Sequence, residues 1–272
     1  MAWKKKALLI LAAGYKSYDD SFKLNEPLLN IGNTLNIDRI KKNYNFKNKI
    51  YIAVNKFPET LKKLNSFSNC NFIDVGDTSS VIETIKLSIT QIDENHIEIL
   101  PITTIPENQL INNNSVYFGD KKISKENWSA IRYSFNKDLE YFFKKDKTSF
   151  KDKCYPFTGR ISSSKKYINE ACNKLNKKQM QDLLYLARLL IDDYGHNIIY
   201  EKWSDSGHSS TYFQTKISSF SSRFFNEVKY CTKKNTIIKK SKDNIKLKKE
   251  KKLLQKYSWS FKHIFSKIIW WK

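Results

Sequence analysis

The sequence has little of what marks a zinc-binding, disulfide-linked or membrane-spanning protein. Its four cysteines in 272 residues lie far apart with no CxxC pair, so neither a zinc site nor a disulfide framework is indicated, and reduced cytoplasmic thiols are expected. No stretch approaches the roughly 20 apolar residues of a membrane span. The basic start and the apolar run Ala7–Ala13 imitate a signal peptide, but the run is short for that role and suits a buried strand better.

Acidic residues are also scarce. There are 27 of them against 49 lysines and arginines, which gives a net charge of +22. Such a balance favours an anionic partner, although lysine enrichment along the whole chain would also follow from a biased genomic composition. Because no nucleic-acid recognition motif accompanies the charge, we expect no specific nucleic acid partner. The 40% of apolar residues are enough for a sizeable core.

Short apolar runs alternate with segments of helical spacing in the first part of the chain. The runs are Ala7–Ala12, Ile50–Val54, Asn71–Val75 and Ile97–Leu100. Runs without polar alternation are typical of strands covered on both faces, and Ser79–Gln91 has apolar residues at helical spacing. The alternation predicts an α/β protein with a doubly wound, mostly parallel sheet.

The remainder of the chain divides into three parts. The segment 101–164 is polar and rich in turn residues, and we expect it on the substrate side. A helix is predicted over Lys177–Tyr194, with Gly195 as its stop, followed by a strand at Ile198–Glu201. Beyond about residue 218 the composition shifts to lysine-rich. We therefore predict one domain over residues 5–218 and a basic, helical C-terminal extension over 219–272.

Two loops after predicted strands have residues suited to a phosphate or a base. Ala13 and Gly14 end the first strand, with Ser17 close behind, and small residues at the carboxyl end of a parallel strand let backbone N–H groups approach a ligand. The second loop is Gly76–Ser80. Its alternative interpretation is a helix N-cap formed by Asp77, Thr78 or Ser79.

Several segments in order resemble the sugar nucleotidyltransferases of capsule and lipopolysaccharide biosynthesis, which have a GT-A type, Rossmann-like fold. They are Leu11–Gly14, Glu26–Ile31, Ile37–Ile40, Gly76–Ser80 and Glu201–His208. The resemblance implies a nucleoside triphosphate and a phosphorylated sugar or polyol as partners. It implies that the nucleotide is bound by Ala13, Gly14, Ser17, Gly76 and Thr78.

Asp205 lies in Trp203-Ser204-Asp205-Ser206-Gly207, which is similar to the closing Trp-x-Asp-x-Gly motif of that family. The resemblance makes Asp205 a catalytic residue that binds Mg²⁺, and hard cations do prefer carboxylate and phosphate oxygens. The alternative is a structural aspartate that caps a turn ahead of Gly207.

The chain also departs from the family pattern. The loop after the first strand lacks the second glycine and the arginine, and Glu26 replaces a lysine, which leaves Lys23 or Lys16 as substitutes; we take Lys23 as the second catalytic candidate. No aspartate follows the strand Ile97–Leu100, where the family has its first metal ligand. Because nucleotidyl transfer depends on positioning and electrostatics, these losses predict slow turnover, and the alternative function is a catalytically degenerate sugar- or nucleotide-binding scaffold.

The C-terminal extension has a resemblance of its own. Ser222–Asn226 and Thr236–Ser241 look like the start of a choline-kinase-like phosphotransferase, but the catalytic lobe of such an enzyme would not fit, so we expect no kinase activity. Lys246–Lys256 can equally be a solvated lysine helix.

We predict that the tail Lys229–Lys272 is an element that docks on the inner face of a membrane or on a protein partner; the alternative is that its aromatic residues pack back on the domain. Aromatic and aliphatic side chains from Trp259 to Trp271 interleave with lysines, as in a basic helix lying among headgroups, where each lysine contributes roughly 1 kcal/mol. In liposome flotation, the chain should bind anionic vesicles and lose binding when residues 258–272 are deleted. No flotation of the intact chain at low salt would mean that the aromatics pack on protein instead.

Overall fold

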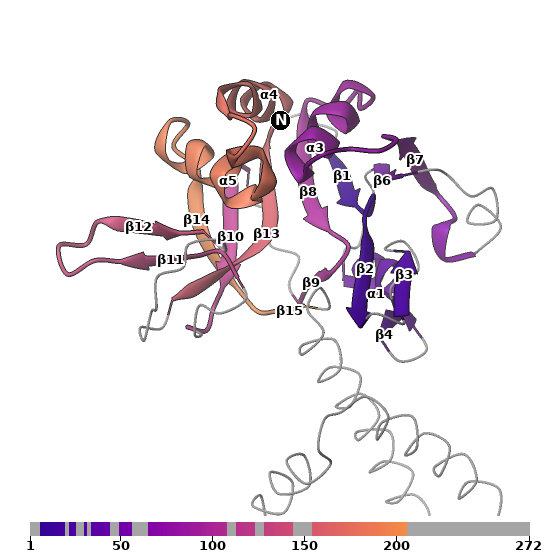
Figure 1. Ribbon diagram of the computed structural model, residues 1–272, viewed down its shortest axis with the longest axis horizontal. Helices are drawn as coiled ribbons and strands as arrows, with labels where there is room; N and C mark the ends of the chain where they lie inside the picture. The colour runs from indigo at the N-terminus through magenta and orange to yellow at the C-terminus, as the bar shows by residue number, and fades with distance from the viewer. Residues whose placement is uncertain are drawn as a thin grey trace, which may run out of the picture. The chain divides into compact units, whose positions relative to one another are not determined.

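The computed structural model describes residues 6–19, 22–25, 30–31, 34–43, 49–55, 65–107, 113–122, 128–143 and 154–205 (Figure 1). The C-terminal extension, including the segment that resembles a phosphotransferase, lies outside these residues. None of the helices described is long and apolar enough to cross a membrane.

Four parallel strands form one half of the central sheet. They are β1 (Lys6–Leu11), β6 (Lys49–Val54), β7 (Cys70–Asp74) and β8 (His96–Pro101), in the spatial order β8-β1-β6-β7. All four strands predicted from the apolar runs are therefore confirmed. In β1 every residue after Lys6 is buried, as expected for a strand covered on both faces.

The other half of the sheet is mixed. Its strands are β10 (Ser115–Gly119), β11 (Ala130–Tyr133), β12 (Leu139–Phe142), β13 (Tyr155–Ser164) and β14 (Asn197–Glu201). β13 runs antiparallel to β8 and joins the two halves; β10 is antiparallel to β13 and parallel to β14. The described residues thus make a nine-stranded sheet. The α/β prediction is confirmed, whereas the segment 101–164 contains far more strand than its polar composition indicated.

Three two-stranded sheets are separate from the central sheet. They pair β2 (Tyr15–Asp19) with β3 (Phe22–Asn25), β4 (Asn30–Ile31) with β5 (Thr34–Leu35), and β9 (Thr104–Pro106) with β15 (Trp203–Asp205). The third of these carries Asp205. Its two strands come from segments about one hundred residues apart in the sequence, so the pairing is a tertiary contact and not a hairpin.

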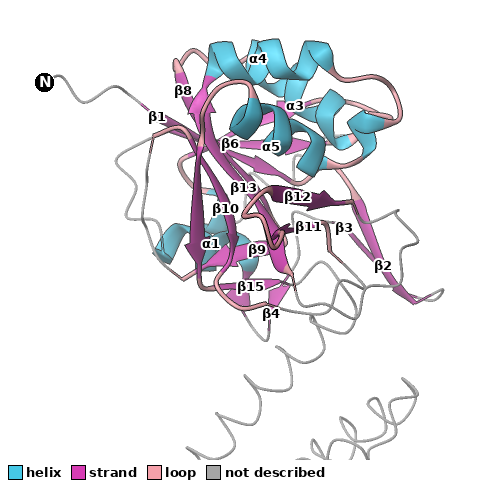
Figure 2. Cartoon of the chain, turned by 90° about the vertical axis from the view of Figure 1, so that its left-hand side faces the viewer, coloured by secondary structure: helices cyan, strands magenta, loops and turns pink. Residues whose placement is uncertain are grey.

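Helices cover both faces of the sheet, as Figure 2 shows. The helices α3 (Val81–Thr90), α4 (Lys165–Lys174) and α5 (Leu183–Asp192) pack on one face through a large apolar core, and α1 (Asn36–Asn43) packs on the other through Ile37 and Ile40. The remaining helical segments described are the short 3-10 turns η2 (Asn65–Phe67) and η4 (Gln179–Gln181).

The predicted helix over Lys177–Tyr194 is divided in the structure. Its first part contains only η4, and α5 begins after Asp182, whose side chain accepts a hydrogen bond from the Leu184 N–H. Aspartate is a favoured N-cap residue, so the apolar stripe continues through the segment while the backbone starts a new helix. Gly195, the predicted stop, has φ of +66° just after α5.

Gly159 is required where β13 crosses the end of β8. Its φ is +82°, and a Cβ atom there would lie 2.6 Å from Cγ of Pro101. Gly195 has a similar φ, but a Cβ there would meet nothing within 4 Å. We predict that Gly159→Ala lowers the free energy of unfolding by about 3 kcal/mol, because left-handed strain and overpacking add, whereas Gly195→Ala lowers it by about 1 kcal/mol. Urea unfolding of the two variants measures the difference; equal losses would contradict the steric part.

Candidate functional site

Main-chain hydrogen bonds join the carboxyl ends of neighbouring parallel strands and keep these ends aligned. Ala12 N–H donates to the Ala53 carbonyl at 2.9 Å, Val75 N–H to Val54 at 3.0 Å, and Ile102 N–H to Leu11 at 3.0 Å. The loops after β1, β6, β7 and β8 therefore leave the sheet at one edge. Ligands of open α/β sheets bind at this carboxyl edge, and four of the seven predicted site residues, Ala13, Gly14, Gly76 and Thr78, follow β1 and β7 there.

Asp205 reaches the same edge from the end of the described chain. β15 pairs antiparallel with β9, so that Asp205 lies opposite Thr104, shortly after β8. Between Pro101 and Pro106, after β8, the sequence has no aspartate. The hydroxyl of Thr104 is buried and donates to the Thr158 carbonyl at 2.7 Å. Nowhere in the described ranges do three or more His, Cys, Asp or Glu side chains form a group that could hold a metal ion.

Ser17 and Lys23 lie opposite each other in the β2–β3 hairpin, which follows Gly14 directly. The structure describes this hairpin through its backbone. Ala13 is half-buried and packs against the core beneath α3–α5, whereas Gly14 is exposed. Ser17, predicted to bind the nucleotide, is thus paired across the hairpin with Lys23, the predicted catalytic residue. Gly14 connects this hairpin to the end of β1.

The loop after β7 is tied to the end of β6. Gly76 has φ of +60°, with open space where a Cβ would lie, and its N–H donates to the Asp74 carboxylate at 2.9 Å. The Asn55 amide donates to the carboxylate of Asp77 at 2.6 Å. Asn55 was not identified from the sequence, because a lone Asn at a strand end is common in ordinary turns.

The start of α3 corrects one sequence interpretation. The N-cap is Ser80, whose hydroxyl accepts from the Glu83 N–H at 3.1 Å, and not Asp77, Thr78 or Ser79. Ser79 binds the Glu83 carboxylate instead, through both its N–H and its hydroxyl at 2.6 Å. Glu83 therefore reaches back to the residue that precedes the N-cap, which is one position away from the bond of a true capping box. Thr78 is bonded to Thr84 within α3, with 2.7 Å between their hydroxyl oxygens.

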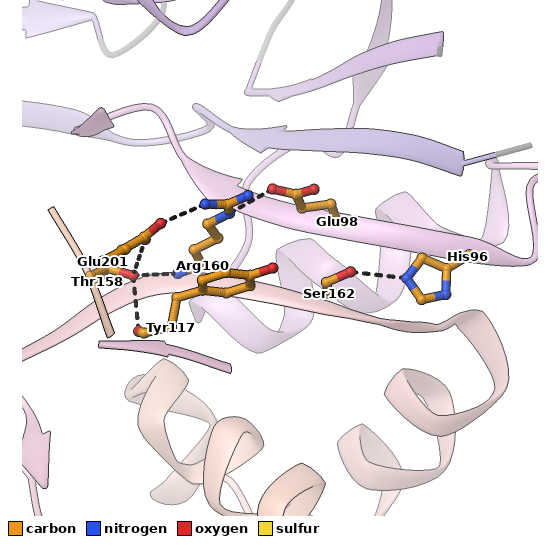
Figure 3. A network of polar contacts seen from close by, with 7 residues as sticks. All are labelled: His96, Glu98, Tyr117, Thr158, Arg160, Ser162 and Glu201. Atoms are coloured by element: carbon orange, nitrogen blue, oxygen red, sulfur yellow. Dashed lines mark hydrogen bonds and ion pairs between the residues drawn. The ribbon is translucent and has the colours of Figure 1, made fainter. Parts of the chain in front are cut away.

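A buried charged network connects β13 to β8, β10 and β14 (Figure 3). The Arg160 guanidinium on β13 donates to Glu98 on β8 at 2.7 Å and to Glu201 on β14, and it lies over the Tyr117 ring at 4.0 Å. Arg160 has no exposed surface. The Thr158 hydroxyl donates to the Tyr117 carbonyl at 2.9 Å and lies 3.2 Å from Glu201 Oε1. Sequence reasoning missed the network because Arg160 is 62 positions from Glu98 and 41 positions from Glu201.

One cation faces two carboxylates in this network, so one carboxyl group is favoured in its protonated form. Burial raises the pKa of Glu201 from 4.5 to about 7, against the lowering effect of Arg160. A folded chain then holds a proton that the unfolded chain releases above about pH 4.5. Between these two pKa values the folded state binds more protons than the unfolded state, so the free energy of unfolding falls as the pH rises. The stabilisation from Glu201 is therefore complete below pH 4.5 and is lost as the pH rises to about 7.

We predict that Glu201→Gln abolishes this pH dependence. Between pH 4.5 and 8, the parent should lose about 3 kcal/mol of unfolding free energy relative to the variant, because a shift of one pKa unit corresponds to about 1.4 kcal/mol. Urea unfolding across this pH range measures the difference. Glu140→Gln, which changes a carboxylate in the partly exposed pair with Arg132, is the control and should leave the slope unchanged. Parallel pH profiles of Glu201→Gln and parent would exclude the role of Glu201.

Comparison with known proteins shows the fold. No protein-family model and no curated protein sequence matches the chain. Among solved structures, a candidate glucose-1-phosphate thymidylyltransferase from Bacillus anthracis, in complex with sucrose, is 13% identical with a TM-score of 0.61, and the match covers 78% of this chain and 94% of that one. HddC from Yersinia pseudotuberculosis complexed with GMP-PN is 11% identical, with a TM-score of 0.56 and coverages of 78% and 98%.

A third similar structure is the inositol-1-phosphate CTP transferase from T. maritima. It is 12% identical with a TM-score of 0.56, and the match covers 79% of this chain and 97% of that one. At these identities the likeness concerns the backbone. The described chain therefore has the α/β fold of the sugar-phosphate nucleotidyltransferases.

Proposed function

We propose that this chain is a cytoplasmic nucleotidyltransferase that joins a nucleoside triphosphate to a phosphorylated sugar or polyol in the biosynthesis of a capsular polysaccharide or lipopolysaccharide. The observation that carries the proposal is the pairing of β15 with β9, which places Asp205 opposite Thr104 at the carboxyl edge of the sheet. The solved structures of similar fold support the substrate class, since their names describe nucleotidyl transfer to glucose 1-phosphate and inositol 1-phosphate.

The reaction is a displacement at the α-phosphorus of the triphosphate. A phosphate oxygen of the acceptor forms the new P–O bond, the bond between the α-phosphorus and the α,β-bridging oxygen breaks, and pyrophosphate leaves with the electron pair. Little covalent chemistry falls to the protein, which binds and orients the two phosphates. In this proposal, Ala13, Gly14, Ser17, Gly76 and Thr78 hold the nucleotide, and Lys23 neutralises phosphate charge.

Asp205 is the residue proposed to hold Mg²⁺. The described residues suit a Mg²⁺ ion that is bound together with the substrate. Such an ion is often held through one or two carboxylates, with substrate phosphates and waters as its other ligands. Asp205 supplies one carboxylate, and the nucleotide would supply the phosphates. When bound, the ion neutralises negative charge on the phosphates. A site made only of protein side chains does not fit, because the described residues include no cluster of three suitable ligands.

A catalytically degenerate scaffold in the same pathway is the second candidate. The observation that favours it is Thr104, which lies opposite Asp205 without a carboxylate and whose hydroxyl is bonded to the Thr158 carbonyl. Release of pyrophosphate separates the two functions. Release of pyrophosphate with sugar 1-phosphates would support the enzyme, and we expect it to be well below the usual enzyme median of about 10 s⁻¹ because of the missing residues. Nucleotide binding without any pyrophosphate release would support the scaffold.

We predict that Asp205→Ala removes Mg²⁺-dependent nucleotide binding while the fold is retained. Asp205 lies at the end of a short strand and is partly exposed, so it contributes charge more than packing. Calorimetric titration of ATP, CTP, GTP, UTP and dTTP, each with Mg²⁺ and with EDTA, measures the effect. Asp93→Ala is the control, since Asp93 is exposed and precedes β8 at the opposite edge of the sheet. Equal Mg²⁺ dependence in Asp205→Ala and parent would refute the metal role.

A further inference from the structure

The short sheet that carries Asp205 is attached to the central sheet through Glu201. The chain leaves β14 at Glu201 and enters β15 two residues later. The main-chain carbonyl of Glu201 accepts from the Asp120 N–H at 2.9 Å. Its side chain is buried and is bonded to the Arg160 guanidinium and to the Thr158 hydroxyl. The start of β15 is therefore held by both the backbone and the side chain of one residue.

The partner strand β9 is attached to the same place on β13. Thr104, which lies opposite Asp205, donates its hydroxyl proton to the main-chain carbonyl of Thr158. The Glu107 N–H donates to the Lys202 carbonyl at 2.9 Å and closes the far end of the pairing. Both strands of the short sheet are thus connected to Thr158. Thr104 of β9 donates to its carbonyl, and Glu201, which precedes β15, lies 3.2 Å from its hydroxyl, whose single proton is shared with the Tyr117 carbonyl.

Thr158 has little freedom to move. It is 2% exposed, and its hydroxyl also bonds the Tyr117 carbonyl on β10 and accepts from the Arg160 N–H at 3.3 Å. The next residue, Gly159, packs against Pro101 with φ of +82°. A residue fixed in this way transmits its position to the groups that it bonds, because buried hydrogen-bond networks and packed backbone resist small displacements.

We propose that Thr158 is a positioning residue for Asp205. It acts on β15 through Glu201, the last residue of β14, and on β9 through Thr104, and so it sets where the Asp205 carboxylate lies at the carboxyl edge of the sheet. The inference rests on the proposed function, in which that carboxylate binds Mg²⁺ together with a nucleotide. Groups that orient metal ligands typically change metal affinity roughly 10- to 100-fold when they are removed.

The test uses Thr158→Val, which keeps the shape of the side chain and removes its hydroxyl, and Thr158→Ser, which keeps the hydroxyl. Calorimetry measures nucleotide affinity with Mg²⁺ and with EDTA, using whichever of ATP, CTP, GTP, UTP and dTTP the parent binds with the largest Mg²⁺ dependence. Thr158→Val should lose the Mg²⁺-dependent gain by about tenfold or more, with an EDTA affinity within about twofold of the parent. Thr158→Ser should restore most of the gain.

Two further variants separate positioning from stability. Ser162→Ala is the matched control: it removes a buried hydroxyl on the same strand, bonded to His96 at 2.9 Å, and should leave the Mg²⁺ dependence unchanged. Thr104→Val removes the bond from β9 and should reproduce Thr158→Val, which keeps the test decisive if Thr158→Val does not fold.

The outcomes distinguish this inference from the proposed function. If Thr158→Val or Thr104→Val is folded and keeps the full Mg²⁺ dependence while Asp205→Ala loses it, the positioning role is wrong and the metal role stands. A loss of equal size in Ser162→Ala would also overturn the positioning role, because it would trace the effect to general loosening of β13. If Asp205→Ala keeps the Mg²⁺ dependence, or the parent has none, both proposals fail.

Discussion

The burial of the Arg160 guanidinium is the constraint on which the two halves of the sheet depend. A guanidinium without exposed surface needs counter-charges, since an unpaired buried charge costs several kcal/mol. Glu98 comes from the parallel half and Glu201 from the mixed half. The strand that carries Arg160 is the one that joins the halves. The ion pairs can therefore form only when β8, β13, β10 and β14 are assembled in the observed order.

The sheet face opposite α3–α5 is divided by this network. Over β1 and β6 it is apolar and is covered by α1 through Leu8, Ile10 and Ile52. Over β13 it carries Thr158, Arg160 and Ser162, all buried and bonded to neighbouring strands. A shift of one residue in the pairing of β13 with β8 would turn Arg160 away from Glu98. The bonds of these polar side chains thus specify the register of β13 on β8 more strongly than apolar contacts alone would.

Local sequence pattern predicted the four parallel strands and β14 of the mixed half, but not β11, β12 and β13, for a physical reason. Buried parallel strands are continuous apolar runs, so β1, β6, β7 and β8 could be found without knowledge of their neighbours. β13 contains Thr158, Arg160 and consecutive serines, which are polar in sequence and become buried only through bonds to other strands. The candidate site followed the same division: the predictions at Gly14 and Gly76 came from strand ends, whereas the contacts of Asn55, Thr158 and Glu201 are not contained in any local pattern.

Because side chains alternate between the two faces of β15, the segment before Asp205 tolerates insertions and deletions poorly. Glu201 is held in the central sheet, and Asp205 lies opposite Thr104 in a separate pairing. The three residues between them, 202–204, are the whole of the connection. Adding or removing one of them would either shift the pairing or turn the Asp205 carboxylate to the other face of the short sheet. The length of this connection is therefore under stricter constraint than the chemical identity of Lys202 or Ser204.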